Sequence, residues 1–299
     1  MKQLVILSGK GGTGKTTVAA ALAHLAFREL SVVLADADVD AANLELVLSP
    51  ERQEEHAFMG GKVAVIDQEK CISCGVCEAA CRFDAVHSLP DSRYRVDPLA
   101  CEGCAACFYR CPAEAIRMEE RESGRWYRSQ TRFGPLFHAR LFPGQENSGK
   151  LVTLVKQQAR LWALDTGADL VLVDGPPGIG CPVISASAGA DLALLVAEPT
   201  VSGIHDLERI LATTEHFGIP ALVVLNKADL NPGRADEIHA FCARRGVPVV
   251  GSIPYDVVVT EAMVQGRTVT EHADGPVSRA LAEVWERIVR FALKRGDGS

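Results

Sequence analysis

A glycine-rich loop near the start of the chain limits the folds that are open to it. Residues 3–7 form a short apolar run typical of a buried strand, and residues 9–16 follow with the pattern G-x4-G-K-T. An alanine-rich stretch with helical spacing runs to residue 30, and residues 31–34 are apolar again. A strand, a loop, a helix and a second strand form a βαβ unit, which predicts a parallel sheet.

The loop itself predicts a phosphate site. In this pattern, backbone N–H groups and the N-terminus of the following helix surround the phosphates. Lys15 is expected to reach the β- and γ-phosphates, and the Thr16 hydroxyl to bind Mg²⁺. Its position between a strand and a helix favours this over a glycine-rich turn that binds nothing. The residues expected to bind the nucleotide are Gly11, Gly12, Thr13, Gly14, Lys15, Thr16 and Thr17.

Eight of the ten cysteines form two copies of C-x2-C-x2-C-x3-C, thirty positions apart. In paired runs of this spacing, the fourth cysteine of each run binds the other run's [4Fe–4S] cluster. The expected ligand sets are Cys71, Cys74, Cys77 and Cys111 for one cluster, and Cys101, Cys104, Cys107 and Cys81 for the other. Zinc also accepts four thiolates, but it suits C-x2-C pairs better than these runs. Arg82 replaces the proline usual after the fourth cysteine, which removes no ligand.

The order of patterns predicts one domain interrupted by another. The expected parts are residues 1–59 and 122–299 of a doubly wound, mostly parallel α/β domain, with residues 60–121 as an inserted α+β ferredoxin-like domain. Strands are expected at 169–173, 190–196, 221–225 and 248–253, and short strands or a loop within 121–150. The amphipathic stretch 278–294 is expected to pack on the sheet, as fold-closing helices do, rather than on a membrane.

Composition limits the partners and the cellular compartment that we expect. The net charge of −7 provides no broad positive field, which argues against a nucleic-acid partner. No apolar run approaches the roughly 20 residues that span a bilayer, and the N-terminus lacks a signal-peptide cleavage pattern. These features predict a cytoplasmic protein, in which clustered cysteines more often bind metal than form disulfides.

Lys10 adds a second lysine to the phosphate loop, which reads K-G-G-T-G-K-T. This loop resembles the deviant phosphate loop of the MinD/ParA/nitrogenase-iron-protein ATPases. In that family the first lysine crosses a dimer interface to the partner's nucleotide. The resemblance therefore implies an ATP-dependent homodimer, although Lys10 could instead only add positive charge to its own site.

Acidic residues at two other places support the resemblance. Asp36, Asp38 and Asp40 follow the second predicted strand, where the family has its first switch. The resemblance implies that Asp38 positions the attacking water; Asp40 could do so instead, or contact Mg²⁺ through water. Asp174 opens D-G-P-P-G, which resembles the second switch, and is expected in the Mg²⁺ shell. The expected catalytic set is Lys10, Lys15, Asp38 and Asp174, with Thr16, Asp38 and Asp174 around Mg²⁺.

Asn226 and Asp229 belong to N-K-A-D, which superficially resembles the guanine-reading motif N-K-x-D. In MinD-like ATPases an asparagine at this place contacts adenine, so the resemblance implies ATP. A second base contact is expected from Pro254. Cys181 lies at the same distance in sequence after Asp174 as a cluster-binding cysteine of the nitrogenase iron protein lies after its switch aspartate. That protein uses a second cysteine, which has no match here. Cys181 is therefore either a small residue packed in the switch turn or a transient thiol for cluster transfer. Cys242 lies in a helical pattern and receives no role.

The chain as a whole resembles MinD-superfamily P-loop ATPases with an inserted ferredoxin domain, and the resemblance extends to residues 146–150. It implies an ATP-hydrolysing protein in which a dimer switch controls two [4Fe–4S] clusters. The output would be electron transfer to a redox partner, or assembly and delivery of a cluster to an apo-metalloprotein. The alternative is a MinD/ParA-like positioning ATPase that uses its clusters as a redox sensor.

Overall fold

A computed structural model describes residues 1–145 and 147–293 and divides the chain into two compact units. The first unit contains Met1–His56, Trp126–Arg140 and the chain from Ser148 onward. The second contains Ala57–Arg125 and Leu141–Asn147. Residue 146, the first of the segment 146–150, and residue 294, the last of the amphipathic stretch 278–294, lie outside the described residues.

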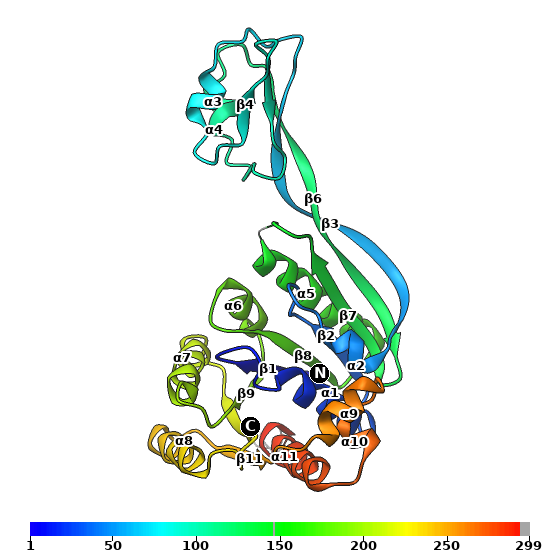
Figure 1. Cartoon of the computed structure of the whole chain (residues 1–299). Coiled ribbons are helices and arrows are strands. Elements are labelled where there is room, and N and C mark those ends of the chain that lie inside the picture. Colours follow the sequence, from blue (N-terminus) through cyan, green and yellow to red (C-terminus); the bar gives the residue numbers. More distant parts are fainter. Residues whose placement is uncertain (146, 294–299) are drawn as a thin grey trace. The chain divides into compact units, whose positions relative to one another are not determined.

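The first unit is built on a mostly parallel sheet, as predicted. The sheet order is β11-β10-β9-β1-β8-β2-β7-β6-β3, and β1 pairs in parallel with both β8 and β9. Its central strands are almost continuously apolar, because helices cover both faces (Figure 1). The strands are β1 (Lys2–Ser8), β2 (Val32–Asp36), β3 (Glu51–Ile66), β6 (Ile116–Thr131), β7 (Gly134–Leu141), β8 (Leu170–Pro177), β9 (Leu192–Ala197), β10 (Ala221–Asn226) and β11 (Val249–Ile253).

The helices fall into two layers that bury alternate residues of the strands. Leu4 and Ile6 of β1 pack in a core with the layer α1 (Lys15–Phe27), α2 (Leu44–Leu48), α9 (Val258–Val264), α10 (Val269–His272) and α11 (Pro276–Leu293). The other layer is α5 (Ser148–Thr166), α6 (Cys181–Ser187), α7 (Gly203–His216) and α8 (Pro232–Arg245). The apolar face of α11 is buried in the first core, in line with the packing expected for this amphipathic helix.

The second unit repeats one backbone twice. Its elements are α3 (Val76–Ala80), β4 (Val86–Ser88), β5 (Tyr94–Val96) and α4 (Ala106–Arg110), with β4 and β5 antiparallel. The two helices are thirty positions apart, and residues with positive φ recur at the same offset: Ser73 with Gly103, Gly75 with Ala105, and Asp84 with Glu114. Among the described residues, its core has eight buried members, three of them cysteines. So small a core needs a further source of stability, such as a bound metal.

The connection between the units differs from the sequence expectation. The expected boundaries lay at 60 and 121, whereas β3 and β6 continue without a break from one unit into the other. Residues 121–150, expected as short strands or a loop, form the end of β6, all of β7 and the start of α5. The segment Leu141–Asn147 belongs to the second unit, where the Phe142 N–H donates to the Ser123 carbonyl at 2.9 Å. Each strand runs through the boundary, so no turn or linker marks it in the sequence.

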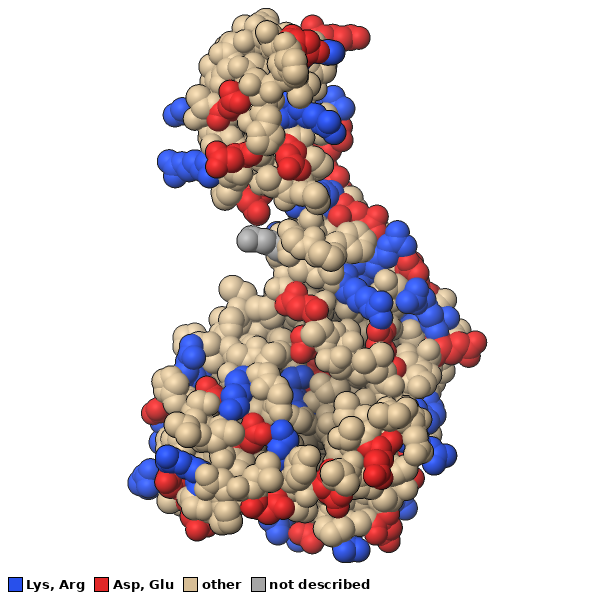
Figure 2. Space-filling view, in the orientation of Figure 1, with Lys and Arg blue, Asp and Glu red and all other residues tan. Residues whose placement is uncertain are grey.

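Two further observations concern the surface. Figure 2 shows one face of the first unit with acidic and basic side chains interspersed. None of the helices in residues 1–145 and 147–293 is both long and apolar enough to cross a membrane.

Candidate functional site

The phosphate loop joins β1 to α1 through a turn that only glycine fits well. Gly12 has φ of 79° and Gly14 has φ of 86°, in the left-handed region. A Cβ on Gly14 would lie 2.2 Å from Nδ2 of Asn226. A Cβ on Gly9 would lie 2.2 Å from the backbone oxygen of Asp206. Close approach of the loop to its neighbours therefore explains why glycine occupies these positions.

Lys15 and Asp174 form a buried ion pair at the base of the loop. Lys15 Nζ lies 2.6 Å from Asp174 Oδ1, and the two side chains are 6% and 0% exposed. Burial alone would lower the pKa of Lys15, but the charge and hydrogen bond of Asp174 outweigh it, so the pKa is raised. Lys15 is therefore a fixed positive charge where the loop would receive phosphates.

One carboxylate oxygen of Asp174 has no partner among the described residues. Its Oδ2 atom is buried and has no hydrogen-bond partner among the described residues, while Oδ1 is held by Lys15. Carboxylate and hydroxyl oxygens are the ligands that Mg²⁺ prefers. An orphaned carboxylate oxygen, together with the half-buried Thr16 that follows Lys15, fits a Mg²⁺ shell at this place.

Three aspartates lie at or just after the end of β2, and Asp36, the last residue of the strand, has a role that the sequence did not reveal. It is fully buried and lies in register with Asp174 on the neighbouring strand. Burial and the charge of Asp174 raise the pKa of Asp36 to about 8. Its carboxylate accepts from the N–H groups of Asp38 at 3.1 Å and Leu44 at 3.0 Å. Asp36 thus anchors the loop that carries Asp38.

Asp38 and Asp40 differ in their surroundings. Asp38 is half-buried, and burial raises its pKa although Lys15 opposes the shift. Asp40 is exposed. Asp38 lies in the field of both Lys15 and Asp174 and is the less exposed of the two, which favours it over Asp40 for orienting a water molecule.

Lys10 is held by residues of its own chain. Its Nζ atom donates to Thr200 Oγ1 at 2.7 Å and lies 3.7 Å from Glu198 Oε2. Lys227 lies 2.7 Å from the other oxygen of Glu198 and donates to the Gly12 carbonyl at 3.2 Å. Glu198 thus links two lysines beside the loop. No sequence motif marks Glu198, although its position just after β9 places it at the same edge of the sheet as the phosphate loop.

A pocket of about 260 Å³ adjoins the loop. Its lining includes Gly12, Gly14, Thr17, Asn226 and Pro254, so it brings both expected base-contact residues beside the phosphate loop. Asn226 also donates to the Thr13 carbonyl at 2.8 Å.

Asp229, the acidic residue of N-K-A-D, is not among the residues that line this pocket. Its Oδ1 accepts from the Tyr255 N–H at 2.7 Å. A guanine-reading carboxylate must face the base, so this placement favours adenine.

The cysteines of the second unit line two cavities. The lining of one cavity includes Cys71, Cys74, Cys77 and Cys111, and that of the other includes Cys81, Cys101, Cys104 and Cys107. Each cavity thus gathers three cysteines of one run and the fourth of the other.

The donor set can be tested against two kinds of metal site. In the described part of the chain, no group of three or more His, Cys, Asp or Glu side chains could hold a metal ion at one point. Four thiols around a cavity fit a multi-iron cluster better than the tight tetrahedron of zinc. The backbone N–H groups of Ala85 and Ala115 also donate to the sulfurs of Cys81 and Cys111, at 3.4 Å and 3.3 Å. Such bonds stabilise thiolates that ligate iron.

The two remaining cysteines lie in the first unit. Cys181 is exposed at the first residue of α6. Cys242 is buried in α8, where burial raises its pKa to about 11, so it is an inert thiol.

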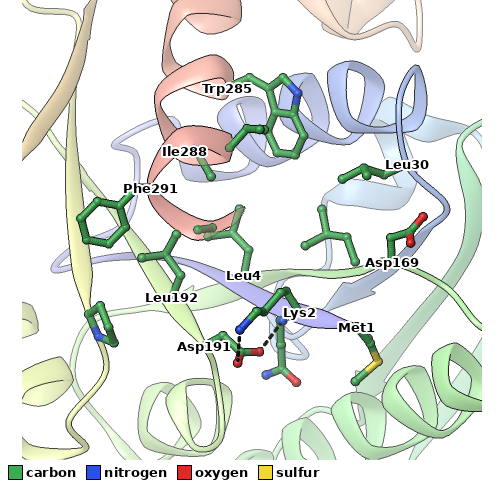
Figure 3. A pocket seen from close by; sticks show the side chains of 15 residues that line it. Met1, Lys2, Leu4, Leu30, Asp169, Asp191, Leu192, Trp285, Ile288 and Phe291 are labelled. Atoms are coloured by element: carbon green, nitrogen blue, oxygen red, sulfur yellow. Dashed lines mark hydrogen bonds and ion pairs between the residues drawn. The ribbon is translucent and has the colours of Figure 1, made fainter. Parts of the chain in front are cut away.

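A further pocket, of about 310 Å³, lies at the opposite edge of the sheet (Figure 3). Its lining includes Leu4, Leu192, Trp285 and Ile288, and Lys2 at its rim lies 3.6 Å from Asp191. These residues adjoin the N-terminal ends of the strands. Parallel sheets bind ligands at the carboxyl ends, where the phosphate loop lies, so this pocket is not the nucleotide site.

A phosphate-binding loop between β1 and α1, at the carboxyl edge of a mostly parallel sheet, defines a P-loop nucleotide-binding protein. The family model for the CobQ/CobB/MinD/ParA nucleotide binding domain matches residues 4–269, and the chain belongs to this family.

Similar proteins agree with this assignment. An uncharacterized protein of Methanocaldococcus jannaschii is 32% identical over 97% of both chains. An iron-sulfur cluster carrier protein of Pyrococcus abyssi is 23% identical over 99% of this chain and 88% of its own. The structure of the septum site-determining protein MinD from Pyrococcus horikoshii, in complex with Mg-ADP, has a TM-score of 0.59 at 19% identity and covers 99% of both chains. That likeness shows the fold.

Proposed function

We propose that the chain is an ATPase whose nucleotide cycle controls two [4Fe–4S] clusters held by the second unit. One observation carries the proposal: the two cysteine runs share two cavities in the crossed arrangement typical of paired clusters. The clusters, when bound, would supply one-electron redox chemistry. In this proposal the second unit is an inserted ferredoxin-like domain that corresponds to residues 60–121.

The first unit would hydrolyse ATP by positioning and charge stabilisation. Backbone N–H groups of the loop bind the phosphates, and Lys15 neutralises charge that develops on them. Thr16 and Asp174 would hold Mg²⁺, and Asp38 would orient the attacking water. The bound metal would supply further positive charge at the β- and γ-phosphates. Asn226 and Pro254 would contact the adenine.

The active species in this proposal is an ATP-dependent homodimer. Lys10 would leave Thr200 and Glu198 and reach the nucleotide of the other subunit. The contacts of Lys10 with hydroxyl and carboxylate groups are ones that a phosphate can replace. Equilibrium sedimentation with ADP and with a non-hydrolysable ATP analogue tests this, and a monomer under both conditions would contradict it.

Electron transfer is the output that the structure supports better than cluster delivery. Each cavity gathers four cysteines; Cys77, Cys101 and Cys107 are buried, whereas one cysteine in each set is exposed. Ligation by four cysteines suits a permanent cluster, whereas a carrier must release its cargo. The similarity to iron-sulfur cluster carrier proteins supports delivery to an apo-metalloprotein.

A second candidate, a positioning ATPase with the clusters as a redox sensor, is supported by similarity to septum site-determining protein MinD of Escherichia coli, 26% identical over 96% of this chain.

Anaerobic reconstitution with iron and sulfide tests the cluster proposal. We expect roughly eight irons per chain, four for each cluster. Cys111→Ser should damage the cluster of the first run and Cys81→Ser that of the second, while Cys181→Ser serves as a matched control with full iron content. Stoichiometric zinc without iron in the purified protein would contradict the proposal.

The output can then be read from the loaded protein. The reduced protein is mixed with ATP and with either a redox acceptor or an apo-acceptor for clusters. Acceptor reduction without loss of iron supports electron transfer, and iron that moves to the apo-acceptor supports delivery. If neither acceptor reduction nor iron transfer occurs and the protein binds a surface or cargo only with ATP, the outcome supports the positioning ATPase.

A further inference from the structure

Helix α2 stands between the nucleotide site and the strands that lead into the second unit. It begins at Leu44, shortly after the loop that carries Asp38, and ends at Leu48. Strand β3 starts at Glu51 and passes into the second unit at Ala57. A displacement of α2 therefore acts on a strand that continues into that unit.

The N-terminus of α2 is tied to the nucleotide site. Asp36 Oδ2 accepts from the Leu44 N–H at 3.0 Å, while its Oδ1 accepts from the Asp38 N–H. The same buried carboxylate lies beside Asp174 in the sheet register. In P-loop proteins the loop at this place rearranges with the γ-phosphate. Because one side chain holds both Asp38 and Leu44, a movement of that loop shifts the start of α2.

The side of α2 is tied to β7. Glu45, 11% exposed, forms an ion pair with Arg140, and its carboxylate packs 3.2 Å from Nδ1 of His138, an atom that has no hydrogen-bond partner among the described residues. His138 is 2% exposed, and its Nε2 lies 2.9 Å from the Ser129 hydroxyl of β6. The residue that follows Arg140 is Leu141, which already belongs to the second unit.

The C-terminus of α2 is tied to the β6–β7 turn. Arg132 donates to the carbonyl groups of Val47 and Leu48, at 3.2 Å and 2.7 Å. Both strands joined by this turn continue into the second unit, β6 at Arg125 and β7 at Leu141. Helix α2 is thus fastened at both ends and along one side.

We propose that α2 transmits the nucleotide state to the second unit, and that Glu45 is the positioning residue that couples it to β7. The proposal rests on the proposed function only in naming the second unit as the output. Movement of α2 shifts His138 and Arg140, and β7 carries the shift into Leu141 and Phe142. Coupling between sites in proteins typically changes equilibria by about 5-fold to 150-fold.

Hydrogen exchange on the full chain, purified and kept anaerobic, tests this with a readout that does not depend on cluster chemistry. The reporters are the Phe142 and Gln145 amides, which donate to the carbonyls of Ser123 and Phe142 at 2.9 Å and 3.1 Å. We expect their exchange rates to differ by at least about fivefold between the Mg-ADP state and the state with Mg²⁺ and a non-hydrolysable ATP analogue.

The variant Glu45→Gln keeps the side-chain size and removes the charge that holds Arg140. It should reduce the difference to less than about twofold while nucleotide affinity is retained. The control is Glu215→Gln on α7, which loses an ion pair with Arg245 of 2.8 Å outside this path. It should keep the full difference.

Two results would overturn the proposal. One is an exchange rate at Phe142 and Gln145 that does not depend on the nucleotide in the wild type. The other is an undiminished difference in Glu45→Gln. If that variant does not fold, Arg140→Gln replaces it, since the Arg140 side chain is 57% exposed, and an undiminished difference there counts equally against α2. Iron content after anaerobic reconstitution tests the proposed function separately: exchange coupling in a chain that takes up no iron would refute the clusters and leave the role of α2 intact.

Discussion

The buried pair of Lys15 and Asp174 offers a quantitative test of how the nucleotide site is held together. Breaking a buried ion pair by removing one partner typically costs about 3–5 kcal/mol, because the other charge stays buried without compensation. Lys15→Met leaves Asp174 and Asp36 buried side by side, so we expect the upper part of this range for the free energy of unfolding.

Asp174→Asn should lower the free energy of unfolding by less than Lys15→Met does. Without its charged neighbour, the pKa of Asp36 falls, because the charge of Asp174 is the second largest cause of its elevation after burial. Asp36 then ionises more readily and partly compensates Lys15. We expect about 3 kcal/mol. The double variant Lys15→Met with Asp174→Asn should cost less than the sum of the single effects by at least about 1 kcal/mol.

The assay is denaturant unfolding of the nucleotide-free protein, followed by tryptophan fluorescence. Trp126, Trp162 and Trp285 all lie in the first unit, so the signal reports on that unit. Additivity of the two single effects within about 0.5 kcal/mol would refute the reasoning, since it would mean that the two side chains do not stabilise each other.

Three further outcomes follow from the structure. Gly14→Ala should lower the free energy of unfolding by about 1–2 kcal/mol, because residue 14 has a positive φ. The added Cβ should also displace Asn226, which predicts at least about tenfold weaker ATP binding by calorimetry; unchanged affinity would contradict the loop geometry. Burial lowers the pKa of His138 to about 4, so as pH falls below about 6.5 the unfolded state takes up the proton first and stability is lost. Between pH 7 and 5 the wild type should lose about 2 kcal/mol more than His138→Gln in denaturant titrations, and equal losses would count against this. Arg132→Met removes the ion pair with Glu271 at 2.7 Å and three hydrogen bonds to carbonyl groups, and should lower the free energy of unfolding by about 2–3 kcal/mol, whereas a change below about 0.5 kcal/mol would mean these contacts contribute little.

The sequence predicted those parts of the fold that local patterns encode. The βαβ unit around the phosphate loop and the mostly parallel sheet are confirmed, because apolar runs and a glycine-rich turn specify them within a few residues. Strands β6 and β7 were not anticipated in this form. β7 also pairs with β2, and β6 with β3, which are far apart from them in the chain, and polar residues on β6 hide its apolar alternation.

The candidate site was predictable where a motif carries the chemistry and not where packing does. Lys15 and Asp174 follow from motifs, and the structure brings them together. The anchoring role of Asp36 depends on the N–H of Leu44, and that of Glu198 on two lysines from different loops. Such partners are set by tertiary structure, so no spacing in the sequence could reveal them.

The crossed arrangement of the cysteine runs bears on how the protein is made. Cys111 lines the same cavity as Cys71, although forty positions separate them, and Cys81 lines the cavity of the second run. During translation, neither cavity is complete until the second run has left the ribosome almost entirely. Under the proposed function, iron must then be inserted after most of the second run has been synthesised, and a chain that stops between the two runs can complete neither cluster site.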